Sequence, residues 1–457
     1  MCHDGRNSPS YMIGRKLLNT TNLVPRIIPR AEHTISRTEI SEYALKVLYR
    51  LKNAGYQGFL VGGGVRDILL GRHPKDFDVA TDATPEDLRD LFRNCRLVGR
   101  RFRLAHVHFG SDIIEVATFR GQHSGDEDED AEVVDGRIVR DNVYGTLEED
   151  ALRRDFTINS LYYNIDDFSV VDYVGGMDDL RARQLRTIGD PAQRYREDPV
   201  RMLRAVRFAG KLDFQIEPNS EEPLRELAAL LEGVPPARLF EEVLKLFLTG
   251  SAEKTFILLR RYRLFASLFP QTDEVLSLEG GPSLEFVYLA LASTDQRVAE
   301  GKPVTPAFIF AALLWVPVER LKRRFVERGM MESDAFAQAA DSVMAGQNQR
   351  VSLPRRFHTS MREIWHLQER FSKRAPKRSA RLVEHPRFRA AYDFLALRAQ
   401  AGDADKELAE WWGQFYSSDE DTRTALVSTV VSDVAEPRRR RRGRRRSNAK
   451  PSGAVAT

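Results

Sequence analysis

The hydrophobic pattern of the chain changes near residue 190. This change is the sequence feature that most restricts which folds the chain can adopt. Before residue 190, short apolar runs such as Gly58–Val61, Asp76–Thr81 and Leu104–Phe109 alternate with helical segments, as in a mixed sheet. After it, apolar residues recur at helical spacing to about residue 415. A chain of 457 residues is also too long for a single core. The sequence therefore predicts an α+β fold, with an N-terminal mixed sheet domain followed by an elongated, all-helical neck and body.

Breaks in composition and periodicity divide the chain into five expected segments. These are a flexible basic leader (1–37), a head domain (38–190), a helical neck (191–275), an arginine-rich helical domain (276–416) and a disordered tail (417–457) that is arginine-rich from residue 437. The acidic segment 123–135 is expected to be a solvated surface loop. The apolar run Pro306–Val318 is shorter than the roughly 20 residues of a membrane span, so it predicts a buried core helix.

The charge of the chain is unevenly distributed. Residues 437–457 carry eight Arg, one Lys and no acidic residue, so the rest of the chain has a net charge of −5 although the whole chain has +4. A basic tail on an acidic body indicates a polyanionic partner, most often nucleic acid. Cys2 and Cys95 have no Cys or His neighbour at metal-ligand spacing, which excludes a disulfide scaffold and favours a reducing cytoplasm.

Two aspartates in Asp76-Phe77-Asp78 are the sharpest local feature. On a strand, residues i and i+2 project from the same face, so both carboxylates could hold Mg²⁺ while Phe77 faces the core. Paired Mg²⁺ ions suit in-line phosphoryl transfer, because they stabilise the attacking and the leaving oxygen. Such a pair is also common in ordinary loops, and by itself it does not establish a metal site.

A glycine turn, Gly62-Gly63-Gly64, lies about ten residues upstream between a predicted strand and a predicted helix. Backbone N–H groups exposed there can cradle phosphates, and Arg66 can add a planar guanidinium to the same phosphates. An ordinary tight turn is the alternative interpretation. The order of the two features, a glycine turn, a short helix and then the aspartate pair on the next strand, favours the phosphate site.

Four segments in succession resemble the motifs of one family, the class II CCA-adding enzymes and bacterial poly(A) polymerases. They are LVGGGVRDILLG (Leu60–Gly71), KDFDVAT (Lys75–Thr81), EEDALRRDFTINSLYY (Glu148–Tyr163) and YREDPVRMLRAVRFA (Tyr195–Ala209). The resemblance implies that the head is a nucleotidyltransferase domain related to DNA polymerase β. It also implies a two-metal Mg²⁺ site, ATP as substrate and an RNA-binding neck.

The resemblance assigns a role to several residues of the head. Asp76 and Asp78 would be the catalytic, metal-binding carboxylates, and Gly62, Gly63, Arg66 and Arg154 would contact the nucleotide. The third functional acid is either Asp155, in the RRDFTIN motif, or Glu115, on the strand IIEVATF. We favour Asp155 as catalytic, with Glu115 as the competing metal ligand. A buried structural acid paired with Arg153 or Arg154 is the alternative for Asp155.

The EDxxR motif of the family matches Glu197-Asp198-Pro199-Val200-Arg201. Asp198, Arg201 and Arg204 are three residues apart and would share one helix face. The family uses this motif as an amino-acid template, in which an acceptor beside a donor reads the edge of the incoming base. An intrahelical ion pair is the alternative interpretation.

Two further features favour the poly(A) polymerase branch over the CCA-adding branch. Leu97–Val107 (LVGRRFRLAHV) resembles a stretch typical of that branch, and Arg350–Arg381 contains ten Lys or Arg against two Glu. The aromatic residues Trp365, Phe357 and Phe371 within it are expected to fill the core. The predicted RNA-binding residues are Arg350, Arg355, Arg356, Arg374, Lys377 and Arg378, with Arg438, Arg439 and Arg440 in the tail.

The implied function is template-independent addition of AMP from ATP to RNA 3′ ends with release of pyrophosphate, which promotes RNA processing and decay. A CCA-adding tRNA nucleotidyltransferase is one alternative, and a non-catalytic RNA-binding protein is the other. The expected partners are 3′ ends of mRNA and of structured and regulatory RNA, with RNA-decay proteins as further candidates. We expect a cytoplasmic monomer.

Overall fold

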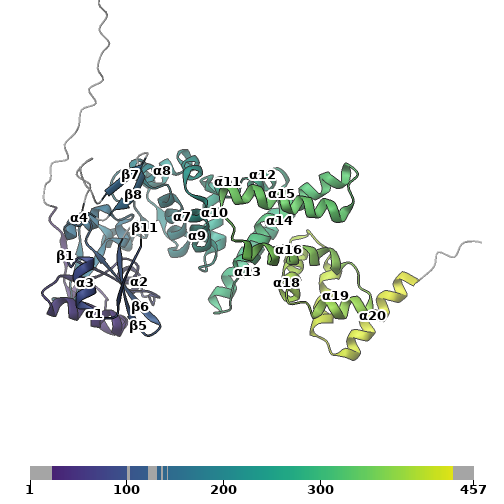
Figure 1. Ribbon diagram of the computed structural model, residues 1–457, viewed down its shortest axis with the longest axis horizontal. Coiled ribbons are helices and arrows are strands. Elements are labelled where there is room, and N and C mark those ends of the chain that lie inside the picture. Colours follow the sequence, from purple (N-terminus) through teal and green to yellow (C-terminus); the bar gives the residue numbers. More distant parts are fainter. Residues whose placement is uncertain (1–22, 100–102, 122–130, 135–136, 142, 436–457) are drawn as a thin grey trace, which may run out of the picture. The chain divides into compact units, whose positions relative to one another are not determined.

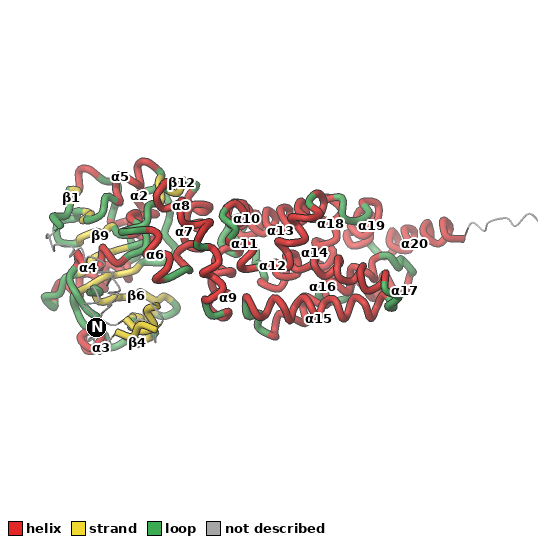
Figure 2. Tube along the Cα trace, turned by 90° about the horizontal axis from the view of Figure 1, so that it is seen from above, coloured by secondary structure: helices red, strands yellow, loops and turns green. Residues whose placement is uncertain are grey.

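The computed structural model describes residues 23–99, 103–121, 131–134, 137–141 and 143–435 (Figure 1). The chain divides into two compact units, one formed by Met1–Val234 with Arg261–Leu264 and the other by Pro235–Arg260 with Phe265–Thr457. All the strands of the described residues belong to the first unit, and the second is helical (Figure 2). The predicted α+β class, with a mixed sheet before a helical body, is therefore confirmed.

An eight-stranded sheet forms the centre of the first unit, in the order β1-β10-β9-β2-β3-β6-β5-β4. The strands are β1 (Arg26–Ile28), β2 (Gly58–Val61), β3 (Asp78–Thr81), β4 (Cys95–Val98), β5 (Leu104–Phe109), β6 (Asp112–Thr118), β9 (Leu161–Asn164) and β10 (Val170–Asp172). Strands β3 and β6 pair in parallel, and every other neighbouring pair in this sheet is antiparallel. The smaller strands pair separately, β7 (Ala131–Val134) with β8 (Arg137–Asp141) and β11 (Gln184–Leu185) with β12 (Gln215–Ile216).

Helices cover the two faces of this sheet unequally. Helices α1 (Glu42–Asn53) and α3 (Pro85–Leu91) pack on one face, and α1 buries its apolar stripe there. On the other face, Phe59 and Tyr162 pack with Ala151 of α4 (Leu147–Arg153). Farther along that face, toward β6, Glu115 stays exposed. The uncovered part of the sheet is where polar chemistry can take place.

Helix α2 (Gly63–Leu69) connects β2 to β3, and further helices of the first unit follow the last strand of the large sheet. They are α5 (Gly176–Ala182), α6 (Pro191–Glu197), α7 (Val200–Leu212) and α8 (Pro218–Glu226). We expected Asp198, Arg201 and Arg204 to lie on one helix, but the chain breaks at Asp198 between α6 and α7. The reason is Pro199, whose ring disfavours helical backbone in the residue before it and which has no N–H to donate.

The second unit contains helices α9 to α20. They are α9 (Pro236–Phe247), α10 (Ala252–Arg261), α11 (Leu264–Leu268), α12 (Pro270–Glu279), α13 (Gly281–Ala299), α14 (Pro306–Glu327), α15 (Glu332–Arg350), α16 (Arg355–Phe371), α17 (Pro376–Val383), α18 (Phe388–Ala401), α19 (Lys406–Ser417) and α20 (Glu420–Ala435). The run Pro306–Val318 is the buried start of α14, as predicted, and Trp365 donates its indole N–H to Ala311 O at 3.0 Å. Phe371 is fully buried as well. Among the described residues, no helix combines the length and apolarity that crossing a membrane requires.

Three expectations about the chain ends and loops need correction. The leader is not loose throughout, because Arg26–Ile28 forms β1 and pairs with β10. The segment 417–457 is not irregular throughout, because Glu420–Ala435 forms α20. The acidic segment 123–135 includes β7 in place of the expected loop, and its remaining residues lie outside the described part, as do residues 1–22 and 436–457. The predicted domain boundaries at 190, 275 and 416 stay predictions.

Candidate active site

Asp78 and Glu115 lie side by side at the uncovered part of the sheet. Asp78 begins β3, which is parallel to β6, and the register pairs Asp78 directly with Glu115. Paired residues of adjacent strands project from the same face, so both carboxylates point to the same side. Asp76 precedes the strand and is exposed, so the expected arrangement of two aspartates at i and i+2 on one strand is wrong in detail. It approaches Asp78 from the loop.

The electrostatics of Asp78 show that acidic groups converge there. Burial raises the pKa of Asp78 to about 6, and repulsion from Glu115 and Asp76 adds to this effect. Attraction to Arg154 acts in the opposite direction but is smaller. A carboxylate whose ionisation is opposed by two others is one that a cation would stabilise. No group of three or more His, Cys, Asp or Glu residues in the described ranges is arranged to hold a metal ion.

The glycine turn predicted to bind phosphate lies directly beside these carboxylates. Gly62 has φ 72° and ψ −132°, which only glycine adopts without strain. A Cβ built on Gly62 would lie 3.8 Å from Asp78 Oδ2 and 3.7 Å from an Arg154 guanidinium nitrogen, Nη1. The open backbone of the turn therefore lies within van der Waals distance of both the Asp78 carboxylate and the Arg154 guanidinium.

Arg154 is held in this place by two buried partners. Its Nε donates to Tyr162 Oη at 2.8 Å, and its Nη2 donates to Asp150 Oδ2 at 2.9 Å. Burial alone would raise the pKa of Asp150, but Arg154 and the Tyr162 hydroxyl hold that pKa below its ordinary value. With Nε and Nη2 fixed, Nη1 is the nitrogen that faces Gly62 and Asp78. The geometry suits the predicted role of Arg154 as a nucleotide contact.

Arg66 does not fit its predicted role as a free phosphate contact. Only 2% of it is exposed, and its Nη1 donates to Asn159 Oδ1 at 2.6 Å while Nε donates to Asp67 at 2.8 Å. The guanidinium also stacks over Phe208, with its carbon 5.1 Å from the ring centre. Arg66 therefore anchors α2 to the rest of the first unit, and the glycines Gly62 and Gly63 leave the backbone of the turn open to a ligand.

Asp155 differs from the catalytic acid that we expected. Its Oδ2 accepts from Arg204 Nε at 2.7 Å, and its Oδ1 accepts from Phe156 N at 2.9 Å and Asn159 Nδ2 at 3.2 Å. Burial would raise the pKa of Asp155, but Arg204, Asn159 and the Phe156 N–H hold it below its usual range. Its carboxylate is committed to protein donors, and Glu115, not Asp155, is the acid next to Asp78. The structure favours the alternatives for both residues: Asp155 as a structural acid, although its partner is Arg204, and Glu115 as the third carboxylate.

The EDxxR segment forms the junction between α6 and α7. Asp198 lies at the C-terminal end of α6 and not on α7 with Arg201 and Arg204, so the three residues do not share one helix face. Arg201 Nη1 donates to Glu197 Oε2 at 2.9 Å and to Arg194 O at 2.8 Å. Arg201 therefore forms an ion pair with Glu197 across the junction of the two helices, and this pair is neither intrahelical nor made with Asp198.

Family models match three parts of the chain. Residues 58–186 match the poly A polymerase head domain, residues 213–276 match a probable RNA and SrmB-binding site of polymerase A, and residues 328–446 match the polymerase A arginine-rich C-terminus. Poly(A) polymerase I of Salmonella typhimurium is 52% identical over 428 residues, which is 92% of either chain. The chain belongs to the poly(A) polymerase I family. It is thus a polynucleotide adenylyltransferase that adds poly(A) without a template.

CCA-adding enzymes are more distant from this poly(A) polymerase. That of Bacillus subtilis is 32% identical over 304 residues, covering 66% of this chain and 73% of its own. A solved structure of the Bacillus stearothermophilus CCA-adding enzyme in complex with CTP has 25% identity and a TM-score of 0.53, covering 86% of this chain and 93% of its own. The predicted family and function are confirmed, and CCA addition belongs to the distant relatives.

An arginine cluster near the site was missed by the sequence interpretation. Burial, with repulsion from Arg120, Arg194 and Arg201, lowers the pKa of Arg153 to about 9. Burial and repulsion from Arg201 likewise lower the pKa of Arg194 to about 10, although Glu197 attracts its charged form. Arg194 Nε is buried and has no hydrogen-bond partner among the described residues. An anion placed among these cations would relieve their mutual repulsion. The arginines come from separate segments, so no local motif marks the cluster.

The predicted RNA-binding residues of the second unit lie on α15, α16 and α17 or next to them. Arg350 ends α15, Arg355 and Arg356 begin α16, and Lys377 and Arg378 lie in the first turn of α17. Arg374 precedes α17 and stacks over Trp411 at 5.6 Å from the ring centre. The tail residues Arg438, Arg439 and Arg440 lie outside the described residues.

Proposed function

We propose that the 3′-hydroxyl of an RNA attacks the α-phosphorus of ATP at the Asp78 site. A new P–O bond forms to the RNA, the bridging bond between the α- and β-phosphates breaks, and pyrophosphate leaves with that electron pair. The 3′-hydroxyl gives up its proton to solvent. The observation that carries this proposal is the pairing of Asp78 with Glu115 on adjacent strands, next to the Gly62 turn that Arg154 Nη1 faces.

Asp76 and Asp78 are the proposed Mg²⁺ ligands, with Glu115 as the third carboxylate. The donor set fits, because Mg²⁺ usually binds one or two carboxylates together with substrate phosphate oxygens. When bound, the metal neutralises charge on the phosphates and stabilises the attacking and leaving oxygens. The chain's own contribution is to hold Asp78 and Glu115 on adjacent strands, with Asp76 on the loop before β3, so that they need no rearrangement before the reaction.

The triphosphate is proposed to lie between the glycine turn and the arginine cluster. Gly62 leaves room for close approach, and Arg154 presents its Nη1 toward that space. Arg153 and Arg194 supply positive charge, and burial together with repulsion from neighbouring arginines lowers the pKa of both guanidinium groups. A polyanion bound beside them would relieve this repulsion. Arg66 holds α2, which follows the turn, through its hydrogen bond to Asn159.

A tailing assay tests the function directly. Purified protein is incubated with an unstructured RNA, Mg²⁺ and each nucleoside triphosphate in turn. Long tails with ATP alone are expected. Addition that stops after CCA on a truncated tRNA would instead indicate the CCA-adding activity, and RNA binding without any addition would indicate a non-catalytic protein.

Glu115→Gln separates the two candidates for the third carboxylate. We expect kcat to fall by about 10²-fold or more, with a higher Mg²⁺ concentration needed for half-maximal rate, because one anionic group is lost beside Asp78. Asp112→Asn, an exposed position on the same strand, is the matched control and should leave both values near wild type. An unchanged Mg²⁺ dependence for Glu115→Gln would remove Glu115 from the metal site.

Arg201→Ala tests the proposed template role of the EDxxR segment. We expect the preference for ATP over CTP to fall about 10-fold, since one donor to a base edge discriminates by about 1–3 kcal/mol. Arg196→Ala is the control, because Arg196 is exposed on α6 and carries the same charge. A slower enzyme with unchanged preference would show that Arg201 only holds Glu197 in place.

The proposed function also implies a biological setting. The RNA substrates are taken to be 3′ ends of mRNA and of structured and regulatory RNA, and the site of action the cytoplasm. RNA-decay proteins are candidate partners, because the model matching residues 213–276 describes a probable protein-binding site as well as RNA binding. Size-exclusion chromatography with light scattering tests the proposed monomer.

A further inference from the structure

A row of charged and polar side chains continues past the carboxylates on the uncovered part of the large sheet. The strand register pairs Asp78 of β3 with Glu115 of β6, and Glu115 with His106 of β5. It also pairs His106 with Arg96 of β4. Paired residues of adjacent strands project from the same face of the sheet. The four side chains therefore form one row across four strands, with acids at one end and basic groups at the other.

Burial along these strands alternates as the row requires. The residues of β5 and β6 that face the helices α1 and α3 are buried, namely Ala105, Val107, Ile114 and Val116. On the other face, Glu115 and Arg96 are exposed and His106 is partly exposed. Helix α3 contacts β4 and β5 from the covered side only of the two faces that the alternation defines. The basic end of the row is thus open to a ligand.

Arg96 has no counter-charge in the described part of the chain. Its side chain is exposed and makes no hydrogen bond or ion pair there. His106 lies between Arg96 and Glu115 in the row, with its Nε2 at 3.4 Å from Glu115 Oε1. Arg103, just before β5, differs because it pairs with Glu86 at 3.1 Å. An exposed arginine in line with the carboxylates is suited to an anionic group of a substrate.

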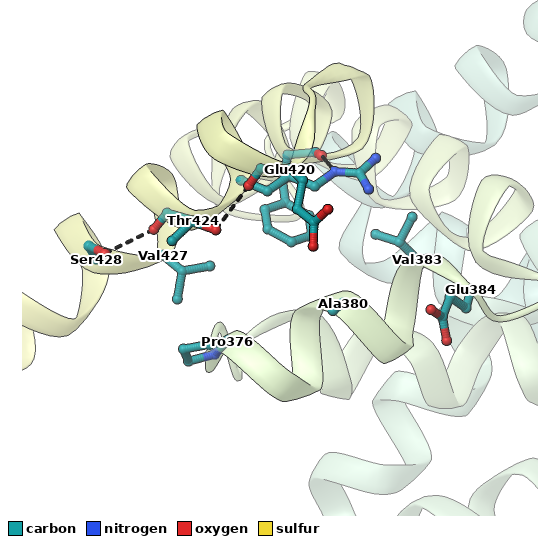
Figure 3. A pocket seen from close by; sticks show the side chains of 10 residues that line it. Pro376, Ala380, Val383, Glu384, Glu420, Thr424, Val427 and Ser428 are labelled. Carbon is teal, nitrogen blue, oxygen red and sulfur yellow. Dashed lines mark hydrogen bonds between the residues drawn. The ribbon is translucent and has the colours of Figure 1, made fainter.

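The volume of a pocket does not by itself mark a phosphate site in this chain. A pocket of about 620 Å³ lies between α17 and α20 of the second unit, and Figure 3 shows Pro376 and Val427 facing each other across it. Glu384 and Glu420 also line this pocket, and its Arg423 donates to backbone carbonyls. Its charged groups are thus unsuited to phosphate, in contrast to Arg96 on the sheet.

The direction of the reaction assigns a substrate to each end of the row. The triphosphate is proposed to lie beside Gly62, which follows β2, and β2 borders β3 on the side away from β6. In an in-line displacement, the attacking and leaving oxygens lie on opposite sides of the phosphorus. Pyrophosphate leaves toward β2, so the RNA 3′-hydroxyl arrives from the side of β6, β5 and β4.

Strand spacing places Arg96 at a suitable distance for the RNA that carries this hydroxyl. Neighbouring strands are about 4.8 Å apart, so the backbone of Arg96 lies roughly 10 Å from that of Glu115. One ribose separates the 3′-hydroxyl from the phosphate that links the last two nucleotides. With the hydroxyl at the carboxylates, that phosphate lies toward β4, where a long guanidinium side chain can reach it.

We propose that Arg96 binds the phosphate between the last two nucleotides of the RNA and so positions the attacking 3′-hydroxyl. The proposal rests on the proposed function, for which it names a substrate contact in the first unit. It also gives a role to the strands that carry Leu97–Val107, because this stretch covers the end of β4 and the start of β5. The triphosphate of ATP shares the same phosphate chemistry and is the competing ligand.

Kinetics of Arg96→Gln test the contact. Initial rates are measured over a range of RNA and ATP concentrations with an unstructured RNA. The variant should lower kcat/KM for RNA about 10-fold or more, with KM for ATP near wild type, because a charged hydrogen bond to the RNA is lost. Arg89→Gln is the matched control, since Arg89 is exposed on α3, which covers the opposite face of the sheet. An unchanged kcat/KM for RNA in Arg96→Gln would overturn the proposal.

A modified RNA tests which phosphate Arg96 binds. A methylphosphonate, which carries no charge, replaces either the last internucleotide phosphate or one farther upstream. In wild type, the change at the last linkage should lower kcat/KM about 10-fold, and in Arg96→Gln it should add little because the contact is already absent. The upstream change should affect both proteins equally. Independent, additive losses from Arg96→Gln and from the last linkage would contradict the assignment.

The competing ligand gives the opposite kinetic result. A raised KM for ATP in Arg96→Gln, with kcat/KM for RNA unchanged, would place the triphosphate over β4 and overturn the proposal. Failure of the wild type to tail any RNA would instead contradict the proposed function. In that case RNA affinity without ATP still tests Arg96, because only the wild type should distinguish the unmodified RNA from the RNA with a methylphosphonate at its last linkage. Thermal unfolding of Arg96→Gln should match wild type, since the side chain is exposed.

Discussion

Asp78→Asn should reduce tailing by at least about 10³-fold while RNA affinity stays near wild type. The substitution keeps the shape of the side chain but removes the charge that is proposed to hold Mg²⁺ beside the triphosphate. Asp76→Asn should act in the same direction. Single-turnover rates with saturating RNA and ATP measure the effect, and Asp90→Asn on the exposed side of α3 is the control. A wild-type rate in either aspartate variant would remove it from the metal site.

The same substitution should stabilise the metal-free protein above pH 6. The folded-state pKa of Asp78 is raised to about 6 from 3.8, so ionisation costs folding free energy as pH rises through that interval. Asp78→Asn removes this cost. Thermal unfolding in EDTA should give the variant the higher Tm at pH 8, and the two proteins should converge near pH 4. A lower Tm at pH 8 would show that the carboxylate is already neutralised by the protein.

Asp155→Ala should lower the free energy of unfolding by about 3 kcal/mol, because it leaves Arg204 and the Asn159 amide without their acceptor. The partly exposed Arg204 keeps the cost toward the lower end of the usual range. The pKa of Asp155 is depressed, so this stability is present above about pH 4 and is lost as pH falls through the folded-state pKa. Urea unfolding measured from pH 7 down to the acid limit of folding gives both the loss at neutral pH and its decrease as the pH falls.

A double-mutant cycle separates this structural role from catalysis. If the pair with Arg204 accounts for the effect, Asp155→Ala with Arg204→Ala should cost less than the sum of the two single changes. Asp155→Asn is informative as well. A variant with wild-type stability but without turnover would restore Asp155 as the third catalytic acid, and Glu115 would then be a neighbour only.

Local signals in the sequence were sufficient for much of the head. The capping box at Thr84 begins α3 as its residues indicate, and the one at Ser36 forms a short turn ahead of α1. The glycine turn and the aspartate pair are adjacent because β2 and β3 are neighbouring strands, which the motif order anticipated. These features depend on residues close in sequence or on a known order of elements.

The errors share a different physical origin. Asp155 finds its counter-charge 49 residues away in Arg204, and Arg66 finds its acceptor 93 residues away in Asn159. Contacts between residues so far apart in sequence produce no local periodicity or motif. A free catalytic acid and a structural acid that pairs with a distant arginine therefore look the same in the sequence.

Strand β1 has a consequence for the solubility of shortened chains. It pairs with β10 through Arg26–Ile28 and so occupies one edge of the large sheet. A chain that began after Ile28 would present the row of unpaired N–H and C=O groups on β10 to other molecules, which invites strand addition between copies. Strand β1 therefore covers an edge of the sheet that removal of Arg26–Ile28 would open to strand addition.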